Sequence, residues 1–537
     1  MDELCERYLL LRDVAGVTRV PFLVKGRLVV PPEIGREAIV AAFEGMEAGD
    51  AYIKRPDCQL IRQPVIDRAS MRATTEYAYQ VLPPVQPLEL IDTDFDALVS
   101  GPYALSVEAV LDYLETIAAC LQDNAATLGR ARELSRRTSL HPDVYLDGAF
   151  ATLQFGLDPQ SARAMVDNEL SLWSQPGSRF LDGWVDVPAD VIPGLAPLLA
   201  QGLPDGSAPA SQGGPRPAIR ALPTRQLHIT AGNAPAIPLV SALRLALTKS
   251  AGVIKCPFEV TLPGALLALA AAAAAPDHPL TRHLSVVYWQ GGDESVEAAL
   301  FAPGAFDRII VWGAPEAVQA VRSKAAFTKT LTFNPRYGLS LIGREAFASP
   351  ERLGQVAAAA GTDVMIYDQK ACTASQVQYV EGTPEQAQAY AERLAEVLGR
   401  WDEMAQPYVP PAARGQVKRM QRGKYAGASW RTNTGPDERY RSGVVVMTNE
   451  FDIMDHPMCR LVVVRPVSDL REALPYLHGG VSTVGVYPEA RRLELRDAVA
   501  ARGVSNVLPL GECERIFAGA PQDGMIVLSE LVDWKNG

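Results

Sequence analysis

The hydrophobic pattern changes character along the first two hundred residues. Up to about residue 100, short apolar runs at 20–24 and 27–30 are broken by Gly26 and by paired prolines, which predicts β-strands. From Ser106 the apolar residues recur every three or four positions, which predicts helices through about residue 172. Residues 1–202 are therefore expected to form a β-rich and then helical region, part of which joins the domain that follows.

A polar stretch interrupts this pattern. Residues 203–215 are rich in Gly, Pro, Ser and Ala and contain almost no large apolar side chain. Such a composition cannot be ordered by packing and is typical of a flexible surface connection. We expect a linker over 203–225.

Regular alternation begins after this linker, since short apolar runs are separated by stretches with helical spacing. Continuous apolar strands that alternate with helices predict βαβ units and a parallel sheet covered on both faces. We expect a Rossmann-like domain over 226–327, with ligands at the carboxyl ends of its strands. The predicted strands are 226–230, 253–256, 284–289 and 308–312, and the predicted helices are 238–250, 262–275, 293–301 and 315–322.

The remaining chain predicts a second α/β lobe, with a catalytic domain over 328–515 and a C-terminal segment over 516–537. Its first part has predicted strands at 330–333 and 339–342, a helix at 351–360, an apolar strand-like run at 363–367 and a long helix at 385–401. Strands at 460–464, 482–487 and 504–508 then alternate with helices at 470–477 and 489–501. The overall fold class is α/β.

Charge and cysteine usage narrow the possible functions. The chain has 51 basic and 62 acidic residues, a net charge of −11, which argues against binding to a nucleic-acid backbone. Its seven cysteines are spread without CxxC spacing, so we expect no disulfide framework and no metal site, and a reducing, cytoplasmic location. The longest apolar stretch, 265–275, is half a membrane span and is ended by Pro276, which predicts a buried helix.

Cys372 is the candidate nucleophile. It lies among small side chains just after the apolar run 363–367, where a thiol is accessible and a free backbone N–H is close to the position of a developing oxyanion. The competing interpretation is packing, because free cysteine is among the most buried residue types. Cys256, beside Lys255, is expected to be a core residue.

Two loops at predicted strand ends are candidates for binding a ligand. Residues 230–238 contain Thr230, Ala231 and Gly232, whose small side chains allow a ligand to approach the backbone before a helix begins. Gly313 and Ala314 follow the fourth strand in a similar loop.

These stretches together resemble the aldehyde dehydrogenase superfamily. Asn233 matches the asparagine whose amide helps to form the oxyanion hole in that superfamily, although an asparagine here could also cap the following helix. Lys255 is similar to the lysine that contacts the adenosine ribose or its phosphate, and Gly313 to the glycine beneath the pyrophosphate. Cys372 falls where the superfamily carries its nucleophile.

Within the superfamily, residues 220–537 resemble the acyl-CoA reductases of the LuxC type. The resemblance rests on the segment 367–369 ahead of the cysteine, the segment 456–460 at the start of a strand, and Asp523-Gly524 followed by 528–534. Together these segments imply an oxidoreductase that forms an aldehyde from an acyl thioester.

Two departures from hydrolytic aldehyde dehydrogenases support reduction. Lys370 stands two residues before the cysteine, where those enzymes have glutamine, and residues 330–338 contain no carboxylate where they carry a general-base glutamate. Attack of water on an acyl-enzyme needs a base, whereas reduction of the acyl-enzyme does not. A carboxylate within reach of Cys372 in the folded protein would instead support an oxidative, CoA-acylating or hydrolytic aldehyde dehydrogenase. A non-catalytic subunit that keeps the fold is a further alternative.

The expected mechanism is covalent. The Cys372 thiolate attacks the thioester carbonyl, the Asn233 amide and the Cys372 backbone N–H hold the oxyanion, and coenzyme A or a carrier-protein thiol leaves. Lys255 favours NADPH through its 2′-phosphate, whereas Glu259 would suit a ribose hydroxyl and NADH.

Three further features accompany this interpretation. The resemblance implies a homo-oligomer. The basic run at 414–424 predicts a solvated face or a docking site for the phosphates of coenzyme A or for an acidic carrier protein. His456 and His478 receive no role, because isolated histidines in a large protein are usually structural or exposed.

Overall fold

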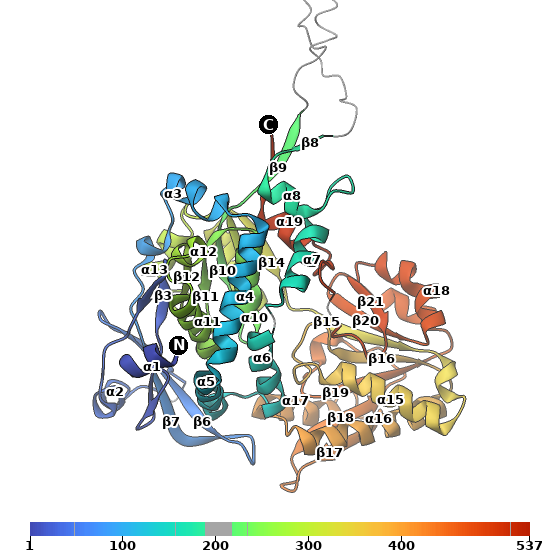
Figure 1. The fold of residues 1–537 in the computed structure, drawn as a ribbon. Helices are drawn as coiled ribbons and strands as arrows, with labels where there is room; N and C mark the ends of the chain where they lie inside the picture. Colours follow the sequence, from blue (N-terminus) through green and yellow to red (C-terminus); the bar gives the residue numbers. More distant parts are fainter. Residues whose placement is uncertain (48, 156, 188–216, 234, 516) are drawn as a thin grey trace, which may run out of the picture.

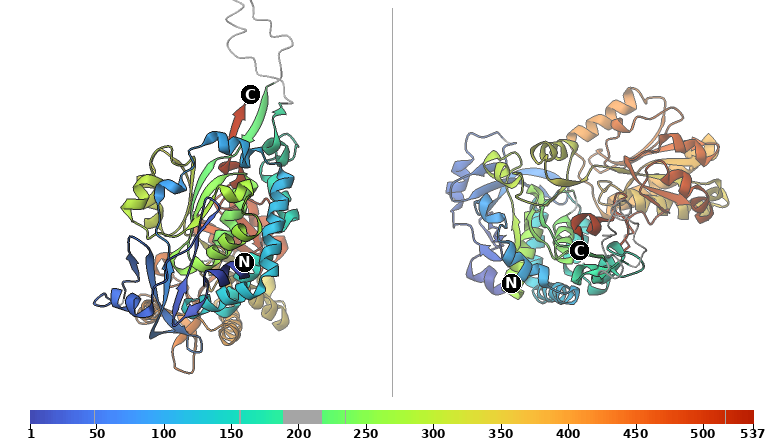
Figure 2. Two further views of the ribbon diagram at one scale, coloured as in Figure 1. Left: turned by 60° about the vertical axis from the view of Figure 1, so that its left-hand side comes forward. Right: turned by 90° about the horizontal axis from the view of Figure 1, so that it is seen from above.

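The computed structural model consists of two α/β lobes, each built on a seven-stranded sheet (Figure 1). It describes residues 1–537 except 48, 156, 188–216, 234 and 516. Seen from above, the lobes lie beside each other, with the N-terminal region on the outer side of the first lobe (Figure 2). The predicted α/β class is confirmed.

The first lobe contains the predicted parallel sheet, in the strand order β14-β13-β10-β11-β12-β3-β4. Its parallel strands are β10 (Arg225–Ile229), β11 (Ala251–Lys255), β12 (Leu284–Val287), β13 (Arg308–Trp312) and β14 (Lys329–Phe333). Because β14 pairs in parallel with β13, this sheet extends beyond the boundary predicted at residue 327.

Two strands from the N-terminal region complete this sheet, as expected. β3 (Phe22–Val24) pairs antiparallel with β12 through Leu23 and Val286, and β4 (Arg27–Val29) pairs with β3. The strands predicted at 20–24 and 27–30 are therefore confirmed within one or two residues.

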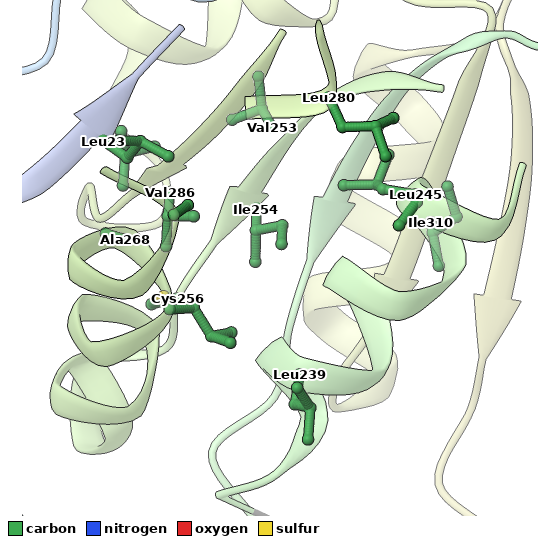
Figure 3. Close-up of a cluster of buried hydrophobic side chains, with 14 of the residues drawn as sticks. Leu23, Leu239, Leu245, Val253, Ile254, Cys256, Ala268, Leu280, Val286 and Ile310 are labelled. Carbon is green, nitrogen blue, oxygen red and sulfur yellow. The ribbon is translucent and has the colours of Figure 1, made fainter. Parts of the chain in front are cut away.

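Helices α10 (Ile237–Leu247) and α11 (Thr261–Ala274) pack on the sheet and against α4 (Val107–Asp123). Residues 261–271 of α11 are all buried, which confirms the buried helix predicted there. Figure 3 shows the core between these helices and the strands. Among the residues with described positions, no helix has both the length and the apolar character needed to cross a membrane. α12 (Pro279–Arg282), α13 (Glu294–Leu300) and α14 (Pro315–Lys324) complete the domain.

The N-terminal region adds a small sheet and a group of helices. The sheet has the order β1-β2-β7-β6-β5, with β1 at Asp13–Val14, β2 at Val17–Arg19, β5 at Tyr52–Lys54, β6 at Gln59–Asp67 and β7 at Arg72–Leu82. The helices are α1 (Asp2–Arg7), α2 (Arg36–Ala42), α3 (Phe95–Ser100), α5 (Ala125–Thr138), α6 (Asp143–Phe155), α7 (Pro159–Glu169) and α8 (Gly177–Asp182).

The second lobe is the predicted second α/β unit, with the strand order β17-β18-β19-β16-β15-β20-β21. All neighbouring strands are parallel except β17 and β18. The strands are β15 (Tyr337–Ile342), β16 (Ser375–Glu381), β17 (Ser429–Thr434), β18 (Tyr440–Val446), β19 (Leu461–Val467), β20 (Val481–Tyr487) and β21 (Asn506–Pro509). The helices are α15 (Pro350–Met365), α16 (Pro384–Met404), α17 (Pro411–Arg422) and α18 (Glu489–Ala500).

Two local predictions in this lobe are wrong. Residues 363–365 belong to α15 and not to a strand, because the helical spacing of its buried side chains continues from Val356 through Ala360 to Val364. The segment predicted as a helix at 470–477 is a 3₁₀ helix, Leu470–Tyr476, in which Pro475 lacks the N–H that an α-helix needs.

The C-terminal segment returns to the first lobe. α19 (Val527–Leu531) is followed by β22 (Asp533–Asn536), which pairs antiparallel with β9 (Ala218–Leu222), and β9 pairs with β8 (Val185–Asp186). Residues 218–222 of the predicted linker are thus a strand, whereas 203–216 lie outside the described residues.

Candidate active site

Cys372 lies in the turn between the end of α15 and the start of β16. Tyr367, Asp368 and Gln369 have φ angles of 46°, 61° and 62°. Residues other than glycine seldom adopt this left-handed backbone conformation. Gln369 holds this turn, because its Nε2 donates to the carbonyl oxygens of Ser375 at 3.0 Å and Leu461 at 2.7 Å. The cysteine therefore follows a fixed turn, and its predicted position directly after a strand is corrected.

A buried arginine ties this turn to the start of β19. Arg460 is fully buried, and its Nε lies 2.5 Å from Asp368 Oδ1 while its Nη1 lies 2.7 Å from Asp402 Oδ1. Its Nη2 donates to the carbonyl oxygen of Ala405 at 2.6 Å. The two sequence segments that resemble the reductases, 367–369 and 456–460, are thus one structural unit beneath the cysteine.

The thiol of Cys372 is half-buried and lies in the field of two opposite charges. Burial raises its pKa above the usual range, and the nearby Asp523 carboxylate raises it further. A hydrogen bond from Ser482 and the Arg336 guanidinium lower the pKa of the thiol again. Arg336 also pairs with Asp523, at 3.6 Å from Nε to Oδ1, so the two charges beside the thiol are coupled.

These three neighbours were not predicted as site residues. Ser482 stands at the start of β20, Arg336 in the connection between the lobes, and Asp523 in the turn before α19. Asp523 was singled out only as part of a resemblance. No periodic pattern marks such residues, because they come from three distant segments that only the folded chain brings together.

Asn233 reaches the cysteine turn from the other lobe. Its side-chain Nδ2 donates to the carbonyl oxygen of Lys370 at 3.3 Å, two residues before Cys372. The alternative role as a helix cap does not apply, since α10 begins after Ala236. The structure therefore brings the two predicted catalytic residues to one place between the lobes.

His141, in the segment between α5 and α6, is another site neighbour that the sequence did not reveal. The ring is buried, hydrogen-bonds the backbone of Gly232, and lies near Lys370 and Asp368. Burial, followed by the Lys370 charge, lowers the pKa of His141 to about 4, so the ring is neutral at physiological pH. Its neutral ring helps to fix the loop that carries Asn233.

The predicted cofactor residues gather at the carboxyl edge of the first sheet. Thr230 Oγ1 donates to the carbonyl oxygen of Lys255 at 2.7 Å, which joins the ends of β10 and β11. A Cβ atom at Gly232 would lie 2.4 Å from Glu259 Oε2, so a larger residue at this position would have to displace that carboxylate. Ala231 lies between these two residues and is partly exposed.

Lys255 lies among aromatic rings and carboxylates. Its Nζ is 5.7 Å from the ring centre of Tyr288 and 5.4 Å from that of Trp289. Burial lowers the pKa of Lys255, whereas the charges of Glu297 and Glu259 raise it. A cation with carboxylates beside it supplies both donors and acceptors for a ribose and its substituents.

Gly313 and Ala314 follow β13, the neighbour of β10, and therefore lie at the same edge of the sheet. Ala314 is the N-cap residue of α14, whose positive helix end favours an anion, whereas Glu316 in the first turn opposes one. The partly exposed Gly313 presents little side-chain bulk there, so the edge fits the pyrophosphate of a nicotinamide cofactor.

The remaining candidates have structural roles. His456 uses both ring nitrogens on backbone groups, with Nε2 3.0 Å from the Leu461 oxygen and Nδ1 accepting from Met458 N–H at 3.0 Å. His478 pairs with the Tyr337 hydroxyl at 3.1 Å. Cys256 is buried, as predicted, and burial raises its pKa to about 12.

The charges beside Cys372 make a prediction about its ionisation. Asp523→Asn removes a charge that raises the thiol pKa, and Arg336→Gln removes a charge that lowers it, so we expect the pKa of Cys372 to fall in the first variant and to rise in the second. The measurement is the pH dependence of iodoacetamide alkylation, read at the Cys372 peptide by mass spectrometry. Asp112→Asn, on the exposed surface of α4, is the matched control. Shifts in the same direction for both variants would contradict the assignment.

Comparison with known proteins gives a consistent result at the sequence level. A family model described as acyl-CoA reductase (LuxC) matches residues 220–534. Long-chain acyl-protein thioester reductases are similar, at 27% identity over 329 residues for Photorhabdus laumondii and 28% over 317 residues for Aliivibrio fischeri. The alignments cover 59% and 57% of this chain, and 64% and 62% of those proteins, so the chain matches less than two thirds of its relatives' length.

Solved structures show the fold. NADP-dependent glyceraldehyde-3-phosphate dehydrogenase from Bacillus halodurans has a TM-score of 0.65 at 14% identity, and the comparison covers 96% of this chain and 98% of that one. Aldehyde dehydrogenase 21 from Physcomitrella patens has a TM-score of 0.64 at 12% identity, with 96% and 97% covered. The predicted aldehyde-dehydrogenase-like fold is confirmed.

Proposed function

Because the chain belongs to the LuxC family of acyl-CoA reductases, we propose that it reduces an acyl thioester to an aldehyde through an acyl-cysteine at Cys372. The observation that carries this proposal is the contact between the Asn233 amide and the turn of Cys372, which joins the two lobes at the carboxyl edge of the first sheet. A nucleophile and an amide donor in that arrangement suit attack on a carbonyl carbon.

In the first step the Cys372 sulfur forms a bond to the thioester carbonyl carbon. The Asn233 Nδ2 group and the Cys372 backbone N–H stabilise the oxyanion, and the bond to the donor sulfur then breaks. Ser482 stabilises the attacking thiolate through its hydrogen bond, while Arg336 offsets part of the unfavourable Asp523 charge. When bound, reduced nicotinamide would supply a hydride to the acyl carbon; the bond from that carbon to the Cys372 sulfur then breaks, which releases the aldehyde and returns the Cys372 thiolate.

Thr230, Ala231, Gly232, Gly313 and Ala314 would hold the phosphate part of the cofactor, with Lys255 and Glu259 beside the adenosine ribose. We place NADPH ahead of NADH because the Lys255 charge suits a 2′-phosphate, although Glu259 suits the free hydroxyl of NADH.

Lys255→Met tests this assignment. Loss of a charge-assisted contact to the 2′-phosphate is expected to raise KM for NADPH about tenfold, with KM for NADH changed by less than about twofold. Steady-state kinetics with both cofactors measure the ratio, and Lys329→Met, on the exposed edge strand, is the control. An equal rise in KM for NADPH and for NADH would contradict a contact between Lys255 and the 2′-phosphate.

The Asp523 carboxylate supports a second candidate, an oxidative aldehyde dehydrogenase. The field that Asp523 exerts on Cys372 shows that a carboxylate is near the thiol, and burial raises the pKa of Asp523 toward that of a useful base. In that enzyme Asp523 would activate water for release of an acid, and Asp523→Asn would trap the acyl-enzyme. The reductase needs no such base, so the same variant keeps its aldehyde formation.

The function is tested by following NADPH absorbance with a panel of acyl-CoA and protein-bound acyl thioesters, with chemical trapping of any aldehyde. NADPH consumption that depends on the thioester and yields the matching aldehyde supports the reductase. Formation of NADPH from NADP and aldehydes, without thioester reduction, supports the second candidate. If the protein neither reduces a thioester nor oxidises an aldehyde, the result would support a non-catalytic subunit. We place the reaction in a reducing cytoplasm, because all seven cysteines are free.

A further inference from the structure

Helix α17 carries an exposed row of cations that have no partner in the described part of the molecule. Lys418, Arg419 and Arg422 are exposed and form no ion pair or hydrogen bond with any described residue, and Arg414, one turn earlier, donates only to the Val409 carbonyl oxygen. Most other arginines and lysines of this acidic chain do form ion pairs. The row is therefore an unusual concentration of unbalanced positive charge, which we call the α17 basic face.

This arrangement is unfavourable for the isolated helix. Lys418 and Arg422 are four residues apart, and Arg419 and Arg422 are three apart, so like charges face each other along one side. Each such pair of like charges destabilises a helix, and α17 contains no acidic residue to offset it. Val417 and Met420 hold the opposite face of the helix on the lobe. Contacts with the described residues do not stabilise these three cations, and this is expected of a surface that binds an anionic partner.

The α17 basic face is attached to the cysteine turn through a short chain of contacts. Gln416 donates to the Asp455 carbonyl oxygen at 2.8 Å, and Arg414 is close enough to Cys459 to lower the pKa of that thiol. The next residue, Arg460, forms the buried ion pair with Asp368, four residues before Cys372. The helix thus belongs to the same side of the second lobe as the turn, and lies at the lower end of that lobe in Figure 1.

The shape of the surface decides between two anionic partners. Bound nucleotides usually lie in clefts, whereas the three cations here are exposed on a helix face. A row of cations that spans about two helical turns fits the acidic surface of a protein, because rim charges steer association and set its orientation. Because the chain carries a net charge of −11, a positive patch of this kind directs an acidic partner to one face of the molecule.

We propose that the α17 basic face is the docking surface for an acidic protein that carries the acyl group as a thioester. The inference rests on the proposed function and names the donor: the partner protein delivers its thioester arm toward Cys372 while its acidic surface lies on α17. Residues Arg414, Lys418, Arg419 and Arg422 supply the charge complementarity.

The test compares one acyl group on three donors, namely pantetheine, coenzyme A and an acidic acyl carrier protein. The full-length enzyme carries Lys418→Glu, Arg419→Glu and Arg422→Glu together. A matched control reverses three exposed cations elsewhere, with Arg352→Glu, Arg496→Glu and Arg502→Glu, and so has the same net charge. Thermal unfolding of both variants reports whether the fold is kept.

We expect kcat/KM with the carrier protein to fall about a hundredfold in the α17 variant, mainly through KM, and to change less than about twofold with acyl-pantetheine. The wild-type reaction with the carrier protein should also weaken steeply with salt. An equal fall with acyl-pantetheine, a loss confined to acyl-CoA, or no loss with the carrier protein would overturn the proposal.

Binding of the fluorescent carrier protein, measured by anisotropy, separates this proposal from the proposed function. Wild type and the control should bind the carrier protein, and the α17 variant should bind it at least about tenfold more weakly. This comparison decides the docking surface even if no donor is reduced, an outcome that would contradict only the proposed function. Equal binding by all three proteins would contradict the docking surface.

Discussion

The Cys372→Ala enzyme is expected to lose thioester-dependent NADPH oxidation by at least about 10⁴-fold, about 5.5 kcal/mol in the activation barrier. The loss follows from removal of the atom that forms the acyl-enzyme, since the oxyanion donors alone cannot accept the acyl group. Cys372→Ser is expected to be nearly as inactive, because a serine hydroxyl is a far weaker acid than a thiol and the Ser482 hydrogen bond and the Arg336 charge do not make up the difference. Initial rates of NADPH oxidation at saturating thioester measure the effect.

Cys120→Ala, a half-buried cysteine on α4 far along the chain, is the matched control and should keep its activity within about twofold. The half-buried position of Cys372 makes its replacement by alanine mild for the fold, so unfolding of the variant should stay close to that of wild type. If the Cys372→Ala variant is correctly folded and keeps full activity, the covalent mechanism is excluded.

The Arg460→Met protein is expected to be less stable by about 3–5 kcal/mol. Asp368 and Asp402 are both buried, and without the guanidinium two carboxylates would remain in the interior without a countercharge. The Asp368→Asn, Asp402→Asn, Arg460→Met triple variant removes the unpaired charges and should recover a large part of the loss. The measurement is the denaturant midpoint of unfolding of the second lobe, followed by tryptophan fluorescence.

Arg471→Met provides the control, because its ion pairs with Asp469 and Glu494 are exposed and should be worth less than about 1 kcal/mol. The turn before Cys372 rests on Arg460, so the alkylation rate of Cys372 should also change in Arg460→Met and recover in the triple variant. A cost below about 1 kcal/mol for Arg460→Met would show that this network does not hold the turn.

The first lobe was largely predictable because its strands are continuous apolar runs and its helices have clear spacing. α11 shows the limit of that signal: it is buried all round, so its length and Pro276 identified it, not an amphipathic stripe. The strand expected at 363–367 is wrong because most of this run is the end of α15, and its helical spacing is visible only when it is taken together with the preceding residues 356–362.

The candidate site was predictable only where it is local in sequence. Cys372 was found from its own neighbourhood and Asn233 from the resemblance of its loop to the aldehyde dehydrogenase superfamily, and the structure brings them together through Lys370. Arg336, Ser482 and Asp523 were missed because their meeting depends on how three chain segments return to one place. Asp523 changes the chemistry most, since the sequence suggested that no carboxylate would be near the thiol.

The most direct test of the account is mass spectrometry of the enzyme after mixing with an acyl thioester in the absence of reduced cofactor, followed by a chase with NADPH. The account predicts one acyl group on Cys372, one donor thiol released per adduct, and its conversion to one aldehyde on addition of NADPH. An adduct on another residue, no adduct, or release of the acyl group as a free acid before NADPH is added would contradict it.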